Sequence, residues 1–211
     1  MIRQSKPIQI IIIDDDLEMK SRPLYEELVE IYGKENVVWK EDADAGVAYV
    51  SKNLDKKTII ILDYDFGSKK ANGLKVFDEL QKKSSLLYII LNTAKSIDEI
   101  PNHELKEFIN NHLMALVDKT DGYERTLLEV KKAIGCLNNR VDCILEEWIL
   151  RHELFTREKP FIKDETGKAI SLNDVLIEIR KDTDFGRKMT NNIISTAISL
   201  IQKDVDKLDK Q

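Results

Sequence analysis

Four short apolar runs in this chain are each followed by a polar side chain: a carboxylate after two of them, a hydroxyl after the third and an amine after the fourth. Residues 10–13 precede Asp14, Asp15 and Asp16, and residues 59–62 precede Asp63. Residues 88–91 come shortly before Thr93, and residues 113–117 shortly before Lys119. Short runs rich in β-branched residues are typical of parallel strands buried on both faces. If these strands are parallel, their polar ends lie along one edge of a sheet, where open α/β sheets bind ligands.

Strand and helix patterns alternate from residue 8 to about residue 137. The predicted strands are residues 8–13, 36–40, 58–62, 86–91 and 113–117, and the predicted helices are residues 17–32, 43–54, 74–80, 97–112 (interrupted by Pro101) and 123–134. This alternation predicts an α/β domain over residues 1–137, built on a doubly wound five-stranded parallel sheet. Right-handed crossovers favour the strand order 2-1-3-4-5.

Residues 138–211 have a different pattern, which predicts a small, mainly helical module. Thr166 and Gly167 predict a turn between two short extended pieces within residues 161–172. A helix over residues 174–180 could be capped by Ser171 or Asn173, and a last helix is predicted over residues 188–208.

A stripe of apolar residues at steps of three and four crosses the boundary between the two predicted domains. It extends from Leu127 to Trp148. One interpretation is that the fifth helix continues through this boundary as a link, or as the seam of a homodimer. Gly135, Asn138 and Asn139 argue against continuity, because each lowers helix propensity.

The composition excludes several classes of function. Hydrophobic residues make up 42% of the chain, charged residues 34%, and the net charge is −5. This balance is typical of a soluble globular protein, and neither half has the basic excess or the helix-turn-helix pattern that DNA binding requires. No apolar stretch approaches the ~20 residues that cross a bilayer, and the first run is too short for a signal peptide. We therefore expect a cytoplasmic protein with no membrane association, in which Cys136 and Cys143 are buried, reduced thiols.

The polar residues at the strand ends form a set suited to phosphoryl chemistry. Asp14, Asp15 and Asp63 would repel one another in one cleft, and a divalent cation relieves such repulsion. Mg²⁺ prefers carboxylate oxygens and keeps positions open for water and phosphate. Lys119 could pair with a carboxylate or with phosphoryl oxygens, and Thr93 could donate a hydrogen bond to the transferred group. Each residue alone has an ordinary structural role; their joint occurrence in this order favours the functional one.

Residues 8–137 resemble the receiver domain of bacterial two-component response regulators, which has a flavodoxin-like fold. The matching pieces are IIIIDDD at 10–16, IILD at 60–63, NGL at 72–74, TA at 93–94 and VDK at 117–119. The resemblance implies a signalling protein rather than an enzyme, in which Asp63 accepts a phosphoryl group. The donor would be a histidine kinase, a phosphotransfer protein or a small phosphodonor.

The same resemblance implies roles for the neighbouring residues. Asp14, Asp15 and Asp63 would hold Mg²⁺ together with the backbone carbonyl of Asp65. Thr93 and Lys119 would contact the phosphoryl oxygens. The helical module would then pass the signal to a downstream protein, which the sequence does not identify, through protein–protein contacts.

The sequence departs from the family pattern in three places. The loop after Asp63 lacks the usual Met-Pro and is longer, Thr120 replaces a proline, and Leu116 replaces the aromatic residue that reports phosphorylation in many relatives. We therefore expect the movement of Thr93 to be transmitted to the surface away from the site in a different way than in the family.

Two alternative functions remain open. Residues 62–65 resemble the nucleophile strand of haloacid dehalogenase-type phosphatases, although Gly67 does not fit that motif and the nucleophile strand of those enzymes is the first, not the third. The second alternative is a pseudo-receiver that binds partners without being phosphorylated.

Overall fold

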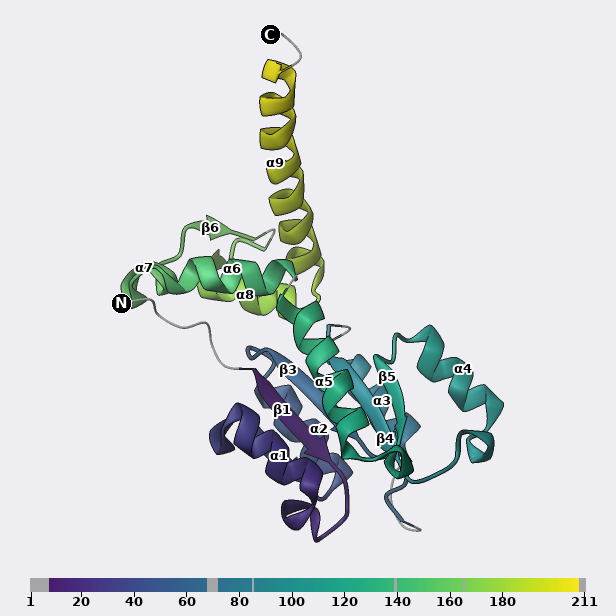
Figure 1. Cartoon of the computed structure of the whole chain (residues 1–211). Coiled ribbons are helices and arrows are strands. Elements are labelled where there is room, and N and C mark those ends of the chain that lie inside the picture. The colour runs from purple at the N-terminus through teal and green to yellow at the C-terminus, as the bar shows by residue number, and fades with distance from the viewer. Residues whose placement is uncertain (1–7, 68–71, 85, 139, 165, 209–211) are drawn as a thin grey trace. The chain divides into compact units, whose positions relative to one another are not determined.

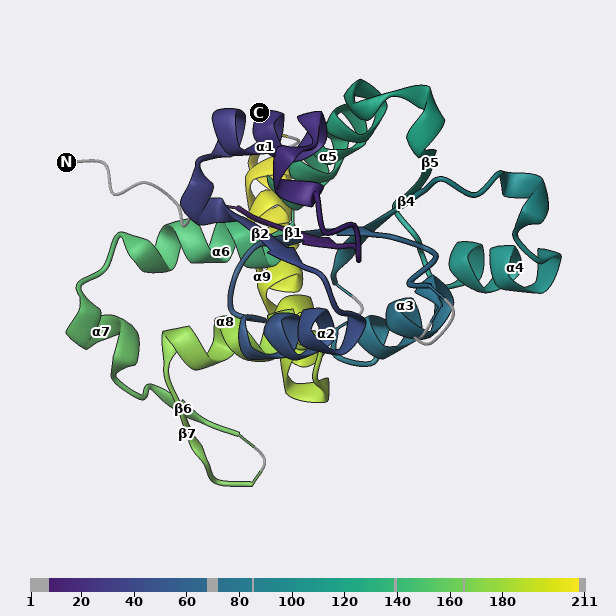
Figure 2. The same cartoon turned by 90° about the horizontal axis from the view of Figure 1, so that it is seen from below.

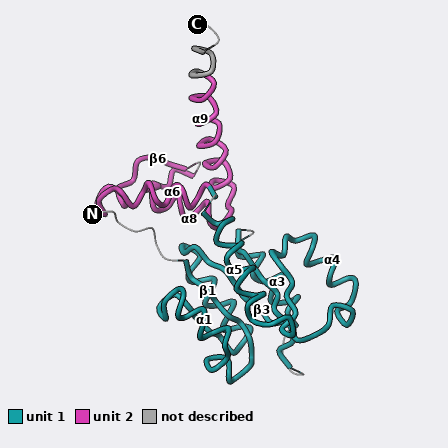
Figure 3. Tube along the Cα trace, viewed as in Figure 1, with its two compact units in different colours: residues 1–140 teal, residues 141–211 magenta. Residues whose placement is uncertain are grey.

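The structure, a computed structural model, describes residues 8–67, 72–84, 86–138, 140–164 and 166–208. Part of the predicted loop after Asp63 (residues 68–71) and Asn139 lie outside the described residues. The chain divides into two compact units, Met1–Arg140 and Val141–Gln211 (Figure 3).

The first unit is built on a five-stranded parallel sheet. Its strands are β1 (Gln9–Ile13), β2 (Val37–Lys40), β3 (Thr58–Leu62), β4 (Tyr88–Thr93) and β5 (Ala115–Asp118), in the order β2-β1-β3-β4-β5 (Figure 1). The predicted fold class and strand order are thus confirmed. Every residue of β1 and β3 is buried, as expected for central strands covered by helices on both faces.

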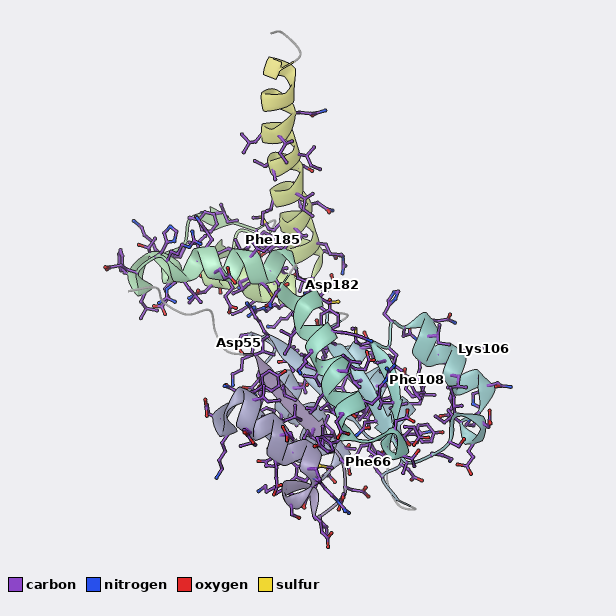
Figure 4. The ribbon with its side chains drawn as sticks, in the orientation of Figure 1. Asp55, Phe66, Lys106, Phe108, Asp182 and Phe185 are labelled. Atoms are coloured by element: carbon purple, nitrogen blue, oxygen red, sulfur yellow. The ribbon has the colours of Figure 1, made fainter. Side chains whose placement is uncertain are left out.

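Five helices cover the two faces of this sheet. They are α1 (Pro23–Tyr32), α2 (Ala43–Lys52), α3 (Gly73–Gln81), α4 (Asn102–Asn110) and α5 (Tyr123–Asn138). α1 and α5 lie on one face, and α2, α3 and α4 lie on the other (Figure 2). On α4, Phe108 is buried and packs edge-on against Phe77 of α3, whereas Lys106 lies on the outer side (Figure 4).

Two prolines set helix boundaries. The first helix was predicted from residue 17, but Pro23 holds Arg22 in an extended conformation (ψ 142°), so α1 begins at Pro23 after a separate 3-10 turn, Met19–Ser21. Pro101 (ψ 135°) likewise separates a 3-10 turn, Ile97–Glu99, from α4.

The second unit contains four helices and a short hairpin among its described residues. These elements are α6 (Val141–Leu150), α7 (Leu154–Glu158), β6 (Ile162–Lys163), β7 (Ala169–Ile170), α8 (Leu172–Arg180) and α9 (Asp184–Leu208). The two extended pieces predicted around the Thr166-Gly167 turn form the antiparallel pair β6–β7. Ser171, not Asn173, caps α8, in a capping box with Asp174.

The second unit has its own small core. Ile170, Val175 and Ile179 form its buried centre, against which the first turns of α9 pack through Phe185, Met189 and Ile193. Here the side chain of Arg180 is 3% exposed and contacts Asp142 and Glu146 of α6, so a cation and two carboxylates lie inside this unit.

Residues 127–148 do not form one continuous helix, which was one interpretation of the apolar stripe. α5 ends at Asn138 and α6 begins at Val141, and Arg140 N donates to Leu137 O at 3.0 Å, an i-to-i−3 bond that closes the end of α5. Leu127 and Leu137 are already buried in the single chain, whereas Ile144 and Trp148 are exposed, and the possible homodimer through this stretch stays a prediction. Asn138, the last residue of α5, has a low helix propensity, which favours an end at this point.

The cysteine prediction is half wrong: Cys143 is buried, but Cys136 is exposed on α5. Within the part of the chain that the structure describes, no helix has both the length and the apolar character needed to cross a lipid bilayer.

Candidate functional site

Three carboxylates meet at the carboxyl edge of the central strands. β1 and β3 are hydrogen-bonded neighbours with Ile13 opposite Leu62, so the next residues, Asp14 and Asp63, leave the sheet side by side. One ligand atom from each of Asp14, Asp15 and Asp63 lies within 4.8 Å of the other two. Asp14 and Asp63 are buried and Asp15 is half-buried. This donor set of carboxylate oxygens fits a hard divalent cation such as Mg²⁺.

Backbone and indole donors hold the carboxylates in place. Asp16 N donates to Asp14 Oδ1 at 2.9 Å, and Trp39 Nε1 donates to the backbone oxygen of Asp14 at 2.8 Å. Tyr64 N donates to Asp63 Oδ1 at 2.9 Å. The two backbone amides orient the carboxylates of Asp14 and Asp63 before any ligand binds, and the indole of Trp39 holds the backbone of Asp14.

Lys119 supplies the positive charge of the site. Its Nζ lies 2.8 Å from Asp14 Oδ2 and 3.2 Å from Asp63 Oδ1. Lys119 begins a 3-10 turn directly after β5, and Asp118 caps this turn by accepting bonds from the backbone nitrogen and the hydroxyl of Thr120. The turn thus points the lysine back across the sheet edge, although no proline follows it.

Burial dominates the electrostatics of Asp63. Burial raises the pKa of Asp63 to about 6; the attraction of Lys119 opposes this shift and the negative charge of Asp14 adds to it. Burial alone would lower the pKa of Lys119, but the carboxylates of Asp63 and Asp14 outweigh it and the pKa is raised. With several carboxylates facing one ammonium, the site favours the binding of further positive charge.

Thr93 and Asp65 flank this cluster. Thr93 ends β4, is buried, and accepts a bond from Lys95 N through its hydroxyl at 3.0 Å. The exposed side chain of Asp65 accepts a bond from Gly67 N at 3.1 Å, which closes a turn that needs the positive φ (70°) of Gly67. The backbone carbonyl of Asp65 as a metal ligand stays a prediction.

A buried pair beside the site was not predicted from the sequence. Tyr64 Oη donates to Glu104 Oε2 of α4 at 2.8 Å, and both residues are buried. Burial and the neighbouring carboxylate raise the pKa of Tyr64 to about 12. A signal was present: Glu104 lies between Ile100 and Phe108 at steps of four, and a carboxylate on a buried helix face needs a partner.

A cleft of about 490 Å³ opens next to Lys119. Its lining comes from the segment after β1, from the end of β4 and from the start of α5, and includes Asp16, Arg22, Asn92, Ala94 and Tyr123. Asp16 and Arg22 form an ion pair at 2.7 Å in its wall. The cleft leaves one side of the lysine accessible to a small molecule or to a partner side chain.

Comparisons with known proteins bear on the fold alone. Neither a family model nor a curated protein matches the chain. Among solved structures, a response regulator receiver domain protein (CheY-like) from Methanospirillum hungatei JF-1 has 17% identity and a TM-score of 0.51, covering 63% of this chain and 98% of that one. The receiver domain of NtrX from Brucella abortus has 18% identity and a TM-score of 0.47, covering 63% of this chain and all of that one. The likeness to the Methanospirillum hungatei protein shows that the first unit has the receiver-domain fold.

Proposed function

We propose that this protein is a phosphorylatable switch of the response-regulator type, in which Asp63 accepts a phosphoryl group. The observation that carries the proposal is the meeting of Asp14, Asp63 and Lys119 within hydrogen-bonding distance at the carboxyl edge of a receiver-type sheet. Two carboxylates, an amine and a nearby threonine are what a phosphoryl acceptor needs for positioning and charge neutralisation.

The reaction consists of one displacement at phosphorus. A carboxylate oxygen of Asp63 attacks the phosphorus of the donor, and the bond from phosphorus to the donor's nitrogen or oxygen breaks as the leaving group takes the electron pair. Lys119 releases Asp63 and pairs with a phosphoryl oxygen, while the Thr93 hydroxyl donates to another. Bound at Asp14, Asp15, Asp63 and the Asp65 carbonyl, Mg²⁺ would neutralise charge on the carboxylates and the phosphoryl group.

The donor is a histidine kinase, a phosphotransfer protein or a small phosphodonor. The cleft beside Lys119 supports this part of the proposal, because it gives a donor access from the side of α1 and α5. Its wall contains charged residues and Tyr123, which suits a polar partner better than a lipid.

The second unit passes the signal on through protein–protein contacts. Beyond the core of this unit, α9 carries large apolar side chains that are exposed: Ile194, Ile198, Leu200 and Ile201. Contiguous exposed apolar residues on a soluble protein mark contact surfaces. The receiving protein is not identified by these residues.

Two experiments separate this function from its alternatives. Beryllofluoride with Mg²⁺ should raise the melting temperature of the wild-type protein but not of Asp63→Asn. An equal response of both proteins, or of neither, would instead support a pseudo-receiver.

Incubation with a chromogenic phosphomonoester addresses the phosphatase alternative. A switch releases one product per chain and then turns over no faster than its acyl phosphate hydrolyses, whereas a phosphatase sustains rapid turnover. The structure does not favour a phosphatase, because Asp63 follows the third strand and its carboxylate lies beside that of Asp14, which follows the first.

A further inference from the structure

One buried carboxylate on α4 holds both ends of the loop that follows Asp63. Glu104 Oε2 accepts from Tyr64 Oη at 2.8 Å, and Glu104 Oε1 accepts from Asn72 Nδ2 at 3.3 Å. Tyr64 is the first residue of this loop, and Asn72 is the N-cap of α3, where its side chain accepts from Lys75 N. Because hydrogen bonds to a buried carboxylate are strong, the loop ends and the first turn of α4 form one connected unit.

The loop ends also hold each other through the backbone. Gly73 N donates to the backbone oxygen of Tyr64 at 2.6 Å. A Cβ at residue 73 would lie 2.7 Å from the Cα of Tyr64 and 2.8 Å from the backbone oxygen of Asp63, so only glycine permits this approach. The backbone of Tyr64 therefore has little freedom to move without moving its neighbours.

Tyr64 is also joined directly to the acceptor and to the loop after β4. Its amide donates to Asp63 Oδ1 at 2.9 Å, so the same residue contacts the carboxylate that would be phosphorylated and the carboxylate on α4. The Lys95 ammonium lies 5.1 Å from the centre of the Tyr64 ring, within cation–π range, and Lys95 N donates to the Thr93 hydroxyl. Tyr64, in the loop after Asp63, thus also contacts the loop after β4 through the side chain of Lys95.

We infer that Tyr64 and Glu104 are positioning residues that couple the state of Asp63 to α4. The inference rests on the proposed function. Phosphorylation converts the anionic Asp63 carboxylate into an acyl phosphate, whose remaining carbonyl oxygen is uncharged, so the bond from the Tyr64 amide weakens and the amide can change its direction. Because the Tyr64 phenol is held by Glu104, that change moves the first turn of α4. This link can take the place of the aromatic residue that the chain lacks at Leu116.

The test compares amide hydrogen exchange of residues 102–110 in the full chain before and after treatment with acetyl phosphate and Mg²⁺. Wild-type protein should show a phosphorylation-dependent difference in exchange over this helix. Tyr64→Phe, which keeps the ring, should lose most of the difference while still gaining one phosphate by intact mass. Glu104→Gln should do the same, and Glu107→Gln, an exposed carboxylate on the same helix, should behave as wild type.

The two readouts distinguish the possible failures. If Tyr64→Phe and Glu104→Gln are phosphorylated and keep the full exchange difference, the coupling role is wrong and the proposed function stands. A wild-type protein that gains no phosphate overturns both, and the mass measurement identifies that case. A merely structural role for the pair would change exchange equally with and without phosphate, leaving the difference intact, and would thus contradict the inference.

Discussion

The Lys119 ammonium lies 2.8 Å from Asp14 Oδ2 and 3.2 Å from Asp63 Oδ1, so one cation joins carboxylates that leave two neighbouring strands. The carboxylates are almost fully buried, while the lysine side chain is 30% exposed. In the absence of a metal, this lysine is the nearest compensation for their charge.

Lys119→Met should therefore destabilise the metal-free protein. We expect a loss of about 1–3 kcal/mol in the free energy of unfolding at pH 7, less than for a fully buried pair because the lysine is partly exposed. Urea denaturation with and without Mg²⁺ measures it, and Mg²⁺ should restore more stability to the variant than it adds to wild type. Lys106→Met, at an exposed position on α4, is the control. Equal losses in the two variants would argue against a special role for Lys119.

The raised pKa of Asp63 predicts an unusual pH dependence of stability. Because its folded-state pKa of about 6 exceeds the ordinary value of 3.8, the folded protein binds more protons than the unfolded chain between these pH values. The contribution of Asp63 to the free energy of unfolding therefore falls as pH rises from about 4 to about 6, by up to ~3 kcal/mol at ~1.4 kcal/mol per pKa unit. Asp63→Asn should lack this component and be the more stable protein at pH 7 without Mg²⁺.

Denaturation curves of the two proteins at a series of pH values check this expectation. Their stabilities should diverge as pH rises through the window and become parallel above it. Curves that stay parallel throughout would show that the surroundings of Asp63 do not disfavour its charge.

Gly73 and Gly135 offer a matched pair of substitutions in helices. Gly73→Ala places a Cβ against the backbone of Asp63 and Tyr64, and we expect a loss of about 1–3 kcal/mol together with slower phosphorylation. Gly135→Ala on α5 meets no atom within 4 Å and should stabilise the protein by up to about 1 kcal/mol through helix propensity. Thermal denaturation and phosphorylation time courses measure both, and a neutral Gly73→Ala would contradict the close packing described here.

The second unit contains a buried cluster of one arginine and two carboxylates, and a substitution can remove the arginine. Arg180 donates to Asp142 Oδ2 at 3.0 Å and to both carboxylate oxygens of Glu146 at 3.1–3.2 Å, with all three residues buried. Arg180→Met should cost about 3–5 kcal/mol, because two buried carboxylates lose this partner. Arg187→Met removes an exposed arginine and should cost less than about 1 kcal/mol. Denaturation followed by the circular dichroism of the α-helices measures both free energies of unfolding. Similar small losses in the two variants would show that the Arg180 cluster contributes little to stability.

The sheet could be predicted because its central strands are continuous apolar runs whose order determines which polar ends meet. Once β1 and β3 are neighbours, Asp14 and Asp63 have to lie together, so this part of the site follows from local patterns. Helix starts were less predictable, since Pro23 and Pro101 moved two of them.

Other features depend on contacts that periodicity does not encode. Two helices that follow one another in the sequence can share one apolar repeat, so the break after Asn138 is invisible in the spacing of residues 127–148. The five residues of α7 are too few to show a helical period. Tyr64 and Glu104 are 40 positions apart, so their hydrogen bond depends on the packing of α4 and cannot be read from local sequence spacing.

As a phosphoryl acceptor held in a carboxylate and lysine site, Asp63 should gain a phosphate from a small phosphodonor. Intact-mass spectrometry after incubation with acetyl phosphate and Mg²⁺, followed by peptide mapping, measures this directly. We predict one added phosphate on wild-type protein, located at Asp63 and absent from both Asp63→Asn and a sample treated with a chelator of Mg²⁺. An unchanged wild-type mass, or a phosphate that persists in Asp63→Asn, would contradict it.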